Sequence, residues 1–194
     1  MTTVRSVCVY CGSSARVDPR YREAASHLGA ALARRGIRVI YGGGRVGLMG
    51  LVADAALAEG GEVVGIIPGH IQALEVEHTE LTELHVVGSM HERKQLMFEY
   101  SDAFVVLPGG LGTLDETFEI LTWKQLALHD KPVILVDEGG YWQPLIGLLD
   151  HMIEEGFCRP EHKALYRRVA SVDAVFEALA QAPEPMVEPQ AKWL

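Results

Sequence analysis

The chain has 194 residues, a formal net charge of −9 and a hydrophobic content of 48%. A chain of this size can bury roughly 70% of its unfolded surface, so we expect one compact domain over residues 1–182, followed by a proline-rich tail over residues 183–194. The acidic balance disfavours nucleic acid as a partner, because a polyphosphate backbone needs a basic face, and no apolar stretch is long enough to span a membrane.

The amino-terminal residues lead directly into a strand-like run and contain no signal-peptide core, which predicts a soluble, cytoplasmic protein. An odd number of cysteines (Cys8, Cys11 and Cys158) does not indicate a disulfide framework. Cys8 and Cys11 match C-x-x-C, but a redox pair needs its first thiol at a helix N-terminus, whereas Cys8 lies in a strand pattern. We therefore expect these thiols to pack as small buried apolar groups.

Short apolar runs alternate with amphipathic helical patterns along most of the chain. The apolar runs predict strands over residues 4–10, 38–41, 63–67, 84–87, 103–107 and 133–136. The helical patterns cover residues 19–35, 48–59, 91–100, 115–128, 143–155 and 172–180. This alternation, with strands that are apolar on both faces, predicts an α/β fold: a single-domain, doubly wound (Rossmann-like) parallel sheet flanked by helices.

Ligands bind such sheets beyond the carboxyl ends of the strands, so the residues after each strand are the candidates for a site. Small and polar residues occur there repeatedly, among them Ser13, Ser14, Gly43, Gly44 and Gly109. Gly42-x-Gly44-x-x-Gly47 also fits the dinucleotide fingerprint, but the following strand ends without the carboxylate that holds a nicotinamide ribose. Glycines needed only for close strand–helix packing are the second alternative, and a loop that faces the substrate is the favoured interpretation.

Arg93 and Lys94 follow the fourth predicted strand at the start of a helix. Arg93 can grip a phosphate or carboxylate through its planar fork, and Lys94 acts as a point charge. The alternative is that both are solvated surface charges paired with Glu92 or Glu99. The position after a strand favours a functional role, at least for Arg93.

The segment over residues 107–116 joins the fifth strand to a helix that is predicted to begin at Asp115. Its three glycines allow a tight turn and close approach to a ligand, and the N–H groups of the helix can then bind phosphate. Glu116 places a carboxylate in the first helical turn. The alternative is a capping box formed by Thr113 and Glu116, but a cap alone does not require so many glycines, so catalysis is favoured.

No residue spacing predicts a metal site, and no G-x-S-x-G elbow predicts a serine nucleophile. Ser13 is better interpreted as a hydroxyl that binds substrate.

The segment Pro108-Gly109-Gly110-Leu111-Gly112-Thr113-Leu114-Asp115-Glu116 resembles the P-G-G-x-G-T-x-x-E signature of the LONELY GUY (LOG) phosphoribohydrolases. The likeness extends to the glycine-rich segments 41–44 and 47–50, to Met90-His91-x-Arg93-Lys94 and to Thr122-Trp123, and it covers roughly residues 4–160. It implies hydrolysis of the N-glycosidic bond of a nucleoside 5′-monophosphate, AMP or a cytokinin riboside monophosphate, to free base and ribose 5-phosphate. It also implies a homodimer and no metal or redox cofactor.

The family's essential arginine and glutamate fall on Arg93 and Glu116. The family's substrate contacts fall on Lys94, on the loop over residues 109–113 and on Thr122. Its contact to the base or the base's substituent falls on Glu75, by alignment across a stretch without a clear motif. Together with the residues at the strand ends, the candidate substrate-binding set is Ser13, Gly43, Gly44, Glu75, Met90, Arg93, Lys94, Gly109, Gly110, Leu111, Gly112, Thr113, Glu116 and Thr122.

The mechanistic hypothesis is that Glu116 stabilises an oxocarbenium-like transition state, holds the ribose hydroxyls and directs a water molecule. Arg93 would neutralise the phosphate or assist departure of the base. Two rivals are a non-catalytic carrier of a nucleotide or cofactor and the lysine decarboxylase label that members of this family have carried. A pyridoxal phosphate enzyme needs a buried Schiff-base lysine, and no lysine here has a recognisable context for one.

Overall fold

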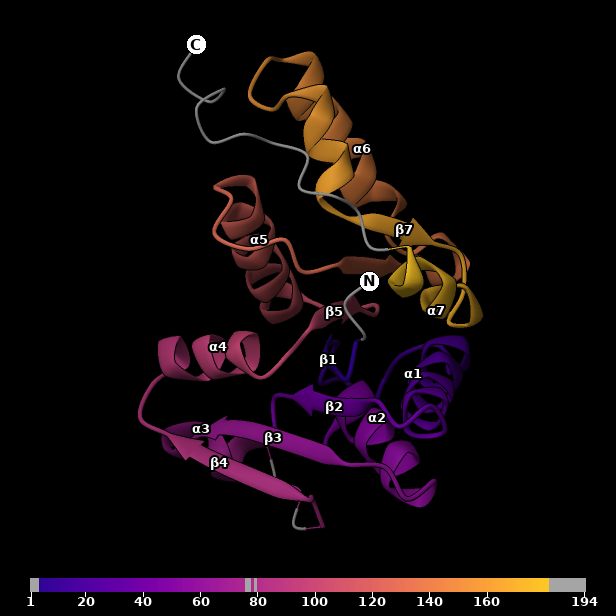
Figure 1. Ribbon diagram of the computed structural model, residues 1–194, viewed down its shortest axis with the longest axis vertical. Coiled ribbons are helices and arrows are strands. Elements are labelled where there is room, and N and C mark those ends of the chain that lie inside the picture. The colour runs from indigo at the N-terminus through magenta and orange to yellow at the C-terminus, as the bar shows by residue number, and fades with distance from the viewer. Residues whose placement is uncertain (1–3, 76–77, 79, 182–194) are drawn as a thin grey trace.

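The computed structural model describes residues 4–75, 78 and 80–181, which build a seven-stranded parallel sheet with helices on both faces (Figure 1). The strand order β4-β3-β2-β1-β5-β6-β7 confirms the predicted doubly wound α/β fold. The strands are β1 (Ser6–Tyr10), β2 (Arg38–Tyr41), β3 (Val63–Pro68), β4 (Glu83–Val87), β5 (Ala103–Val106), β6 (Val133–Val136) and β7 (Arg167–Val169).

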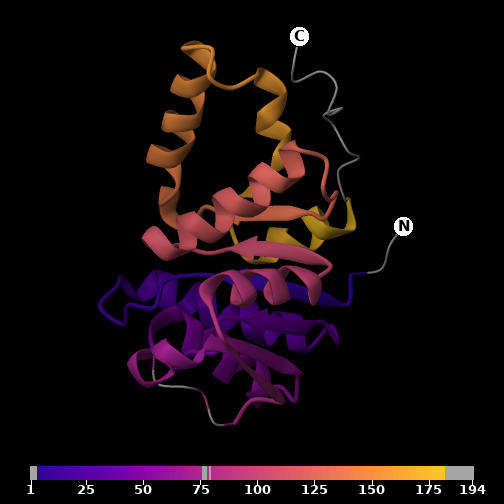
Figure 2. The same ribbon diagram turned by 90° about the vertical axis from the view of Figure 1, so that its left-hand side faces the viewer.

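Two sets of helices cover the sheet. The helices are α1 (Pro19–Ala33), α2 (Gly47–Ala58), α3 (Gly69–Glu75), α4 (Met90–Glu99), α5 (Leu111–Gln125), α6 (Gln143–Glu154) and α7 (Asp173–Ala180), with short 3-10 turns η1 (Glu138–Gly140) and η2 (Pro160–Leu165). Apolar side chains of α1, α2 and α7 pack on one face of the sheet, and those of α4, α5 and α6 pack on the other. Figures 1 and 2 show the two layers from perpendicular directions.

The strands form because their side chains are apolar on both faces. Along β1, Val7 and Val9 point into the core under α1 and α2, whereas Cys8 and Tyr10 point into the core under α4 and α5. Val7 pairs with Val39 of β2 on one side and with Ala103 of β5 on the other, so β1 lies in the interior of the sheet. Strands buried on both faces are typical of parallel sheets.

The chain reverses its direction of strand addition between β1 and β5. The strands from β1 to β4 extend the sheet one way, and β5 to β7 extend it the other way. Crevices at such reversals are where doubly wound sheets bind ligands, because the loops after the two central strands diverge there. The Gly12 N–H donates to the Pro108 carbonyl oxygen (3.1 Å), which ties the loop after β1 to the loop after β5.

The strand β7, the helix α3 and the 3-10 turns η1 and η2 were absent from the sequence prediction. β7 is a three-residue edge strand in which Arg167 and Arg168 hide the strand signal, and it is formed by pairing with Ile134 and Leu135 of β6. α3 is a single short helix of seven residues between β3 and β4. The predicted tail over residues 183–194 lies outside the described residues.

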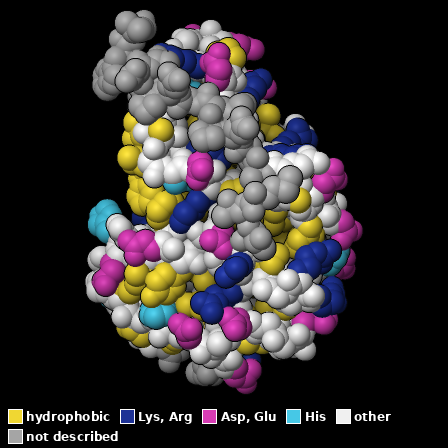
Figure 3. Space-filling model, in the orientation of Figure 1, with side chains coloured by type: hydrophobic (Ala, Val, Ile, Leu, Met, Phe, Trp, Pro, Cys, Tyr) yellow, Lys and Arg dark blue, Asp and Glu magenta, His cyan; other side chains and the backbone are white. Residues whose placement is uncertain are grey.

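On the face seen in Figure 3, Lys and Arg side chains are intermixed with Asp and Glu side chains. None of the helices in the described part of the chain has both the length and the apolar character that a membrane crossing requires.

Candidate active site

The N-terminus of α5 is open to solvent beside the strand reversal. Gly110 is the N-cap residue and its side chain supplies no cap, and the first N–H bonded within the helix is that of Leu114, which donates to the Gly110 carbonyl oxygen (3.0 Å). The N–H groups of Leu111, Gly112 and Thr113 therefore have no acceptor in the helix. Such a set of N–H groups is suited to bind phosphate.

Packing within the protein does not require two of the three glycines of this loop. A Cβ atom added at Gly110 or Gly112 would meet no heavy atom within 4 Å, so the protein itself has room for a side chain at both positions. Gly109 differs, because a Cβ atom there would lie 2.1 Å from the Thr113 hydroxyl oxygen. Gly110 and Gly112 thus leave space for a group that approaches the helix from outside.

The predicted start of the helix at Asp115 is wrong, since α5 begins at Leu111. Thr113 therefore lies inside the first turn, and Glu116 is the sixth residue of the helix rather than a residue of the first turn. The capping-box alternative for Thr113 and Glu116 fails for the same reason. Thr113 instead accepts a hydrogen bond at its carbonyl oxygen from the Thr117 hydroxyl (2.6 Å).

Arg93 lies buried below the loop that follows β2. Its Nη2 donates to the Gly42 carbonyl oxygen (2.7 Å) and its Nε to the Ile66 carbonyl oxygen (3.1 Å). A Cβ atom at Gly42 would lie 2.0 Å from Nη2, so glycine is required there by the guanidinium. Only 4% of Arg93 is exposed, and the interpretation of Arg93 as a solvated surface charge is wrong.

Met90 supports the same guanidinium. It is the first residue of α4, and its sulfur accepts from Arg93 Nη1 at 3.8 Å. The preceding Ser89 caps the helix, because its hydroxyl oxygen accepts from the Glu92 N–H (3.1 Å). The M-H-x-R-K segment therefore begins a helix that aims Arg93 at the carboxyl ends of β2 and β3.

Glu116 brings negative charge to the carboxyl end of β1. Burial, followed by the charge of Glu116, raises the pKa of the Cys8 and Cys11 thiols, and burial raises the pKa of Tyr10, with Cys8 and then Glu116 adding to it. The two cysteines belong to cores on opposite faces of the sheet, so the C-x-x-C segment is no redox pair. Glu116 on α5 therefore lies close enough to the end of β1 for its charge to affect the groups there.

Lys94 is buried between α4 and α5. Its ammonium forms ion pairs with Asp115 (3.2 Å) and Glu119 (3.1 Å), and 9% of the residue is exposed, so the surface-charge alternative is wrong here too. Burial lowers the pKa of Lys94, but the hydrogen bonds with Glu119 and Asp115 outweigh it and raise the pKa above its usual value. Lys94 in this chain holds α4 against the helix that carries Glu116.

The loops after β1 and β2 lie against each other beside this cluster. Gly47 has φ +69°, and a Cβ atom there would lie 2.3 Å from the Ser13 carbonyl carbon, so close backbone packing requires this glycine. Ser13 is exposed, whereas Gly43 and Gly44 are buried, and the Gly43 carbonyl oxygen accepts from the His78 N–H (3.1 Å). Contacts within the protein therefore require Gly42, against the Arg93 guanidinium, and Gly47, against the backbone of Ser13.

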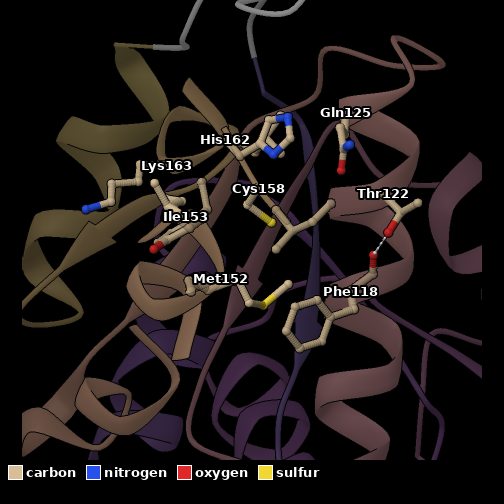
Figure 4. Close-up of a pocket in the computed structure, with 12 residues that line it drawn as sticks. Phe118, Thr122, Gln125, Met152, Ile153, Cys158, His162 and Lys163 are labelled. Carbon is tan, nitrogen blue, oxygen red and sulfur yellow. Dashed lines mark hydrogen bonds between the residues drawn. The ribbon is translucent and has the colours of Figure 1, made fainter. Parts of the chain in front are cut away.

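Thr122 lies away from the glycine loops. It is close to the end of α5, about 16 Å along the helix from Leu111, and its hydroxyl donates to the Phe118 carbonyl oxygen (2.7 Å). It lines a pocket of about 150 Å³ between α5 and α6, together with Gln125, Met152 and Cys158 (Figure 4). The side chain of Glu75 lies outside the described part of the structure.

Two kinds of contact at this edge were not predicted from the sequence. The Tyr141 hydroxyl donates to the Gly109 carbonyl oxygen (2.7 Å), and Asp115 and Glu119 hold Lys94. Asp115 is part of the nine-residue signature and could have been suspected, whereas nothing in the spacing of Tyr141 points to a partner 32 residues away. Among the described residues, no group of three or more His, Cys, Asp or Glu side chains could hold a metal ion.

Residues 49–179 match the family model described as "Possible lysine decarboxylase". The chain is also 50% identical over 159 residues to the cytokinin riboside 5′-monophosphate phosphoribohydrolase of Rhodococcoides fascians, which covers 81% of this chain and 80% of that protein. It is 45% identical over 156 residues to an Arabidopsis thaliana protein of the same name, which covers 80% of this chain and 73% of the relative.

Solved structures with the same fold include carriers. The molybdenum cofactor carrier protein of Chlamydomonas reinhardtii is 23% identical, with a TM-score of 0.70, and covers 93% of this chain and 98% of its own. The molybdenum cofactor binding protein of Rippkaea orientalis is 22% identical, with a TM-score of 0.70 and the same coverage. At these identities the likeness shows the shared fold alone.

Proposed function

Because the chain belongs to the LOG family of phosphoribohydrolases, we propose that it hydrolyses the N-glycosidic bond of an adenosine 5′-monophosphate or its N6-prenylated, cytokinin form. The products are the free base and ribose 5-phosphate. The proposed unit of activity is the single domain over residues 1–182. No metal or redox cofactor takes part in the proposed reaction.

The proposal rests on an open helix N-terminus and a carboxylate in the second turn of the same helix, α5. The N–H groups of Leu111, Gly112 and Thr113 are suited to the 5′-phosphate. Burial and then the charge of Glu116 raise the pKa of Cys11, which follows β1, and β1 pairs with β5. An anion-binding loop gains nothing from a nearby negative charge unless the charge serves chemistry on the bound molecule.

The reaction breaks the bond between C1′ of ribose and the base nitrogen and forms a bond between C1′ and a water oxygen. Positive charge develops on the ribose in the oxocarbenium-like transition state, and a carboxylate stabilises that charge. Glu116 holds the ribose hydroxyls and accepts the proton of the attacking water. The bond electrons move onto the nitrogen of the departing base, and that nitrogen takes up a proton from solvent, while Glu116 returns the water's proton to solvent.

The position of Arg93 favours a role at the base and sugar rather than at the phosphate. Arg93 is held at the ends of β2 and β3, whereas the phosphate-binding loop follows β5. Strands lie about 4.8 Å apart, so the ends of β2 and β5 are separated by roughly 10 Å. A nucleotide with its phosphate at α5 would extend its base toward Arg93. The positive charge of Arg93 then stabilises the negative charge that develops on the leaving base.

We propose that the active form is a homodimer. Thr122 matches a family substrate contact, yet it lies about 16 Å along α5 from the phosphate-binding end. One nucleotide cannot bridge that distance, so Thr122 would contact substrate bound to a second copy of the chain. The apolar side chains of Leu128, Leu148 and Phe157, which are 67%, 51% and 84% exposed, supply a surface for that copy.

The proposed partners are therefore a nucleoside 5′-monophosphate and a second copy, and not nucleic acid. The net charge of −9 supports this, because a polyphosphate would be repelled. The free cysteines Cys8, Cys11 and Cys158 favour a reducing compartment, and we propose a cytoplasmic location on that ground.

The carrier alternative is the weaker one, because the named carriers share the fold at 22–23% identity, whereas the phosphoribohydrolases are 45–50% identical. A pyridoxal phosphate mechanism also fits the described lysines poorly. It needs a neutral amine at the site, but Lys94 has a raised pKa and two carboxylate partners. Burial lowers the pKa of Lys124 and Lys131, which lie near the start of β6 at the opposite edge of the sheet.

The test is a panel of nucleoside 5′-monophosphates, including AMP and N6-isopentenyladenosine monophosphate, with the products separated by chromatography. The proposal predicts free base and ribose 5-phosphate in equal amounts from at least one adenine nucleotide. A carrier would bind the nucleotide and return it intact. A pyridoxal phosphate enzyme would instead show the cofactor's absorbance band after the cofactor is added.

A further inference from the structure

A tyrosine from outside the signature segment contacts the phosphate-binding loop. The Tyr141 hydroxyl donates to the Gly109 carbonyl oxygen at 2.7 Å, although the residues are 32 positions apart. Tyr141 follows η1, so this contact joins the turn after β6 to the loop after β5. None of the motifs in the chain assigns a role to this residue.

The contact fixes the direction of one peptide group. In a trans peptide the carbonyl and the following N–H point in opposite directions, so holding the Gly109 oxygen toward Tyr141 turns the Gly110 N–H away from it. The Pro108 carbonyl oxygen is held in the same way by the Gly12 N–H (3.1 Å), which fixes the Gly109 N–H. Two consecutive N–H groups before α5 are thus oriented by contacts to their carbonyl neighbours.

Glycine would otherwise leave this segment poorly defined. A glycine has more accessible backbone conformations than any other residue, and a Cβ atom at Gly110 would meet no heavy atom within 4 Å that could restrain it. The hydrogen bond from Tyr141 supplies a restraint that side-chain packing does not supply.

Tyr141 is itself held in place by its neighbours. Its ring packs edge-to-face on Trp142 (4.8 Å between centroids) and on Tyr21 of α1 (5.4 Å). The backbone N–H of Trp142 donates to the buried Asp137 carboxylate (2.6 Å), which also forms an ion pair with Arg168 (2.7 Å). The position of Tyr141 is therefore fixed through Trp142 by the buried carboxylate of Asp137 at the end of β6.

We propose that Tyr141 is a positioning residue, which orients the Gly109–Gly110 peptide so that the loop binds the phosphate group of its ligand. The inference rests on the proposed function only for the identity of that ligand. Because the hydroxyl acts through the loop, its removal weakens the binding of ligands that carry a phosphate and leaves the binding of phosphate-free ligands unchanged.

The experiment compares Tyr141→Phe with wild type by calorimetric titration with ribose 5-phosphate and with adenosine. The matched control is Tyr21→Phe, which removes a hydroxyl from the same aromatic cluster without touching the loop. Losing one hydrogen bond predicts about 3- to 10-fold weaker binding of ribose 5-phosphate by Tyr141→Phe, and unchanged binding of adenosine. Hydrolysis of the monophosphate should show the same rise in KM, with kcat nearly unchanged, since the phosphate contact is made in both the ground and the transition state.

Unchanged affinity of Tyr141→Phe for ribose 5-phosphate would overturn the inference, as would an equal loss for both ligands or no binding of ribose 5-phosphate by wild type. A wild-type protein that binds ribose 5-phosphate but releases no base would overturn the proposed function alone. The titration then still decides the role of Tyr141.

Discussion

Gly42 has no side chain because the guanidinium of Arg93 occupies the space where one would be. A Cβ atom there would lie 2.0 Å from Arg93 Nη2, and the same nitrogen donates to the Gly42 carbonyl oxygen. We expect Gly42→Ala to displace the guanidinium, to cost about 1–3 kcal/mol of unfolding free energy through overpacking and to lower kcat. Chemical denaturation and steady-state kinetics measure the two effects.

The matched control is Gly147→Ala in α6, where an added Cβ atom would meet nothing within 4 Å. Replacing this helical glycine by alanine should raise the free energy of unfolding by about 0.5–1 kcal/mol. If Gly42→Ala were as active and as stable as Gly147→Ala, the placement of Arg93 would be wrong.

A substitution at Gly112 distinguishes a glycine required by a bound ligand from one required by packing within the protein. Its position in the first turn of α5 has room for a Cβ atom. Gly112→Ala should therefore keep or slightly raise thermal stability, while the methyl group obstructs the phosphate and raises KM. Thermal unfolding and the KM for AMP check the two halves. A variant with an unchanged KM would show that the phosphate does not approach this turn.

The sequence singled out Glu116 and Arg93 as candidates because chemistry limits the residue types at a glycine-rich strand–helix junction and after a strand. The burial of Arg93 agrees with a role beyond a surface charge, and the catalytic roles of both residues stay predictions. Tyr141 could not be predicted, because its contact with Gly109 is made by the folding of two separate loops onto one edge. The burial of Lys94 was also unpredicted, since its partners Asp115 and Glu119 lie on another helix.

At the level of elements, most strands and helices followed from the pattern of apolar residues. The start of α5 did not, because Gly110 and Gly112 were interpreted as loop residues, although a glycine can be the N-cap or lie in the first turn of a helix. The missed strand β7 contains only three residues, two of them arginines, and owes its conformation to β6. The local sequence does not predict β7, because its extended conformation depends on pairing with β6.

The turn between α5 and β6 contains a histidine that should make stability depend on pH. His129 Nδ1 accepts from the Lys131 N–H (3.1 Å), and its Nε2 lies 2.8 Å from the Ile120 carbonyl oxygen, so the neutral ring with hydrogen on Nε2 fits both partners. Burial lowers the pKa of His129. The folded state therefore resists protonation, and its stability is complete above the unfolded pKa of about 6.5.

As pH falls through about 6.5, His129 takes up a proton in the unfolded chain but not in the folded chain. The free energy of unfolding therefore declines until the pH passes below the lowered pKa of His129 in the folded state. We expect the melting temperature of His129→Gln to fall less than that of wild type between pH 7.5 and pH 5. His151→Gln, which changes an exposed histidine on α6, should follow the wild-type curve. Parallel curves for His129→Gln and wild type would contradict the assignment.

For the whole molecule, the strand reversal between β1 and β5 accounts for the convergence of loops from distant parts of the chain. The loop after β1 contacts the loop after β5 through Gly12 and Pro108 and the loop after β2 through Ser13 and Gly47, because parallel strands end at the same edge of the sheet. The same topology leaves α6 with no buried residue in the described chain. An amphipathic helix in that situation is well suited to pack against another copy.

We therefore predict that the protein elutes with about twice the 21.3 kDa mass of one chain. Leu148→Asp should shift the light-scattering mass toward one chain, because it places a charge on the exposed apolar face of α6, and activity should fall with the dimer. Arg22→Asp, on the exposed side of α1, is the control and should remain dimeric. A fully active monomer would contradict the proposed contribution of Thr122 across the dimer.

In the proposed reaction, Glu116 performs the chemistry on a nucleotide whose phosphate lies at the N-terminus of α5. The direct measurement is the rate of free base release from AMP or N6-isopentenyladenosine monophosphate by wild type and by Glu116→Gln at equal concentrations of folded protein. We expect base release by wild type and a loss of rate on the order of 10²- to 10⁴-fold in the variant, which still binds the nucleotide. A variant that releases base at a rate near that of wild type would contradict this role of Glu116.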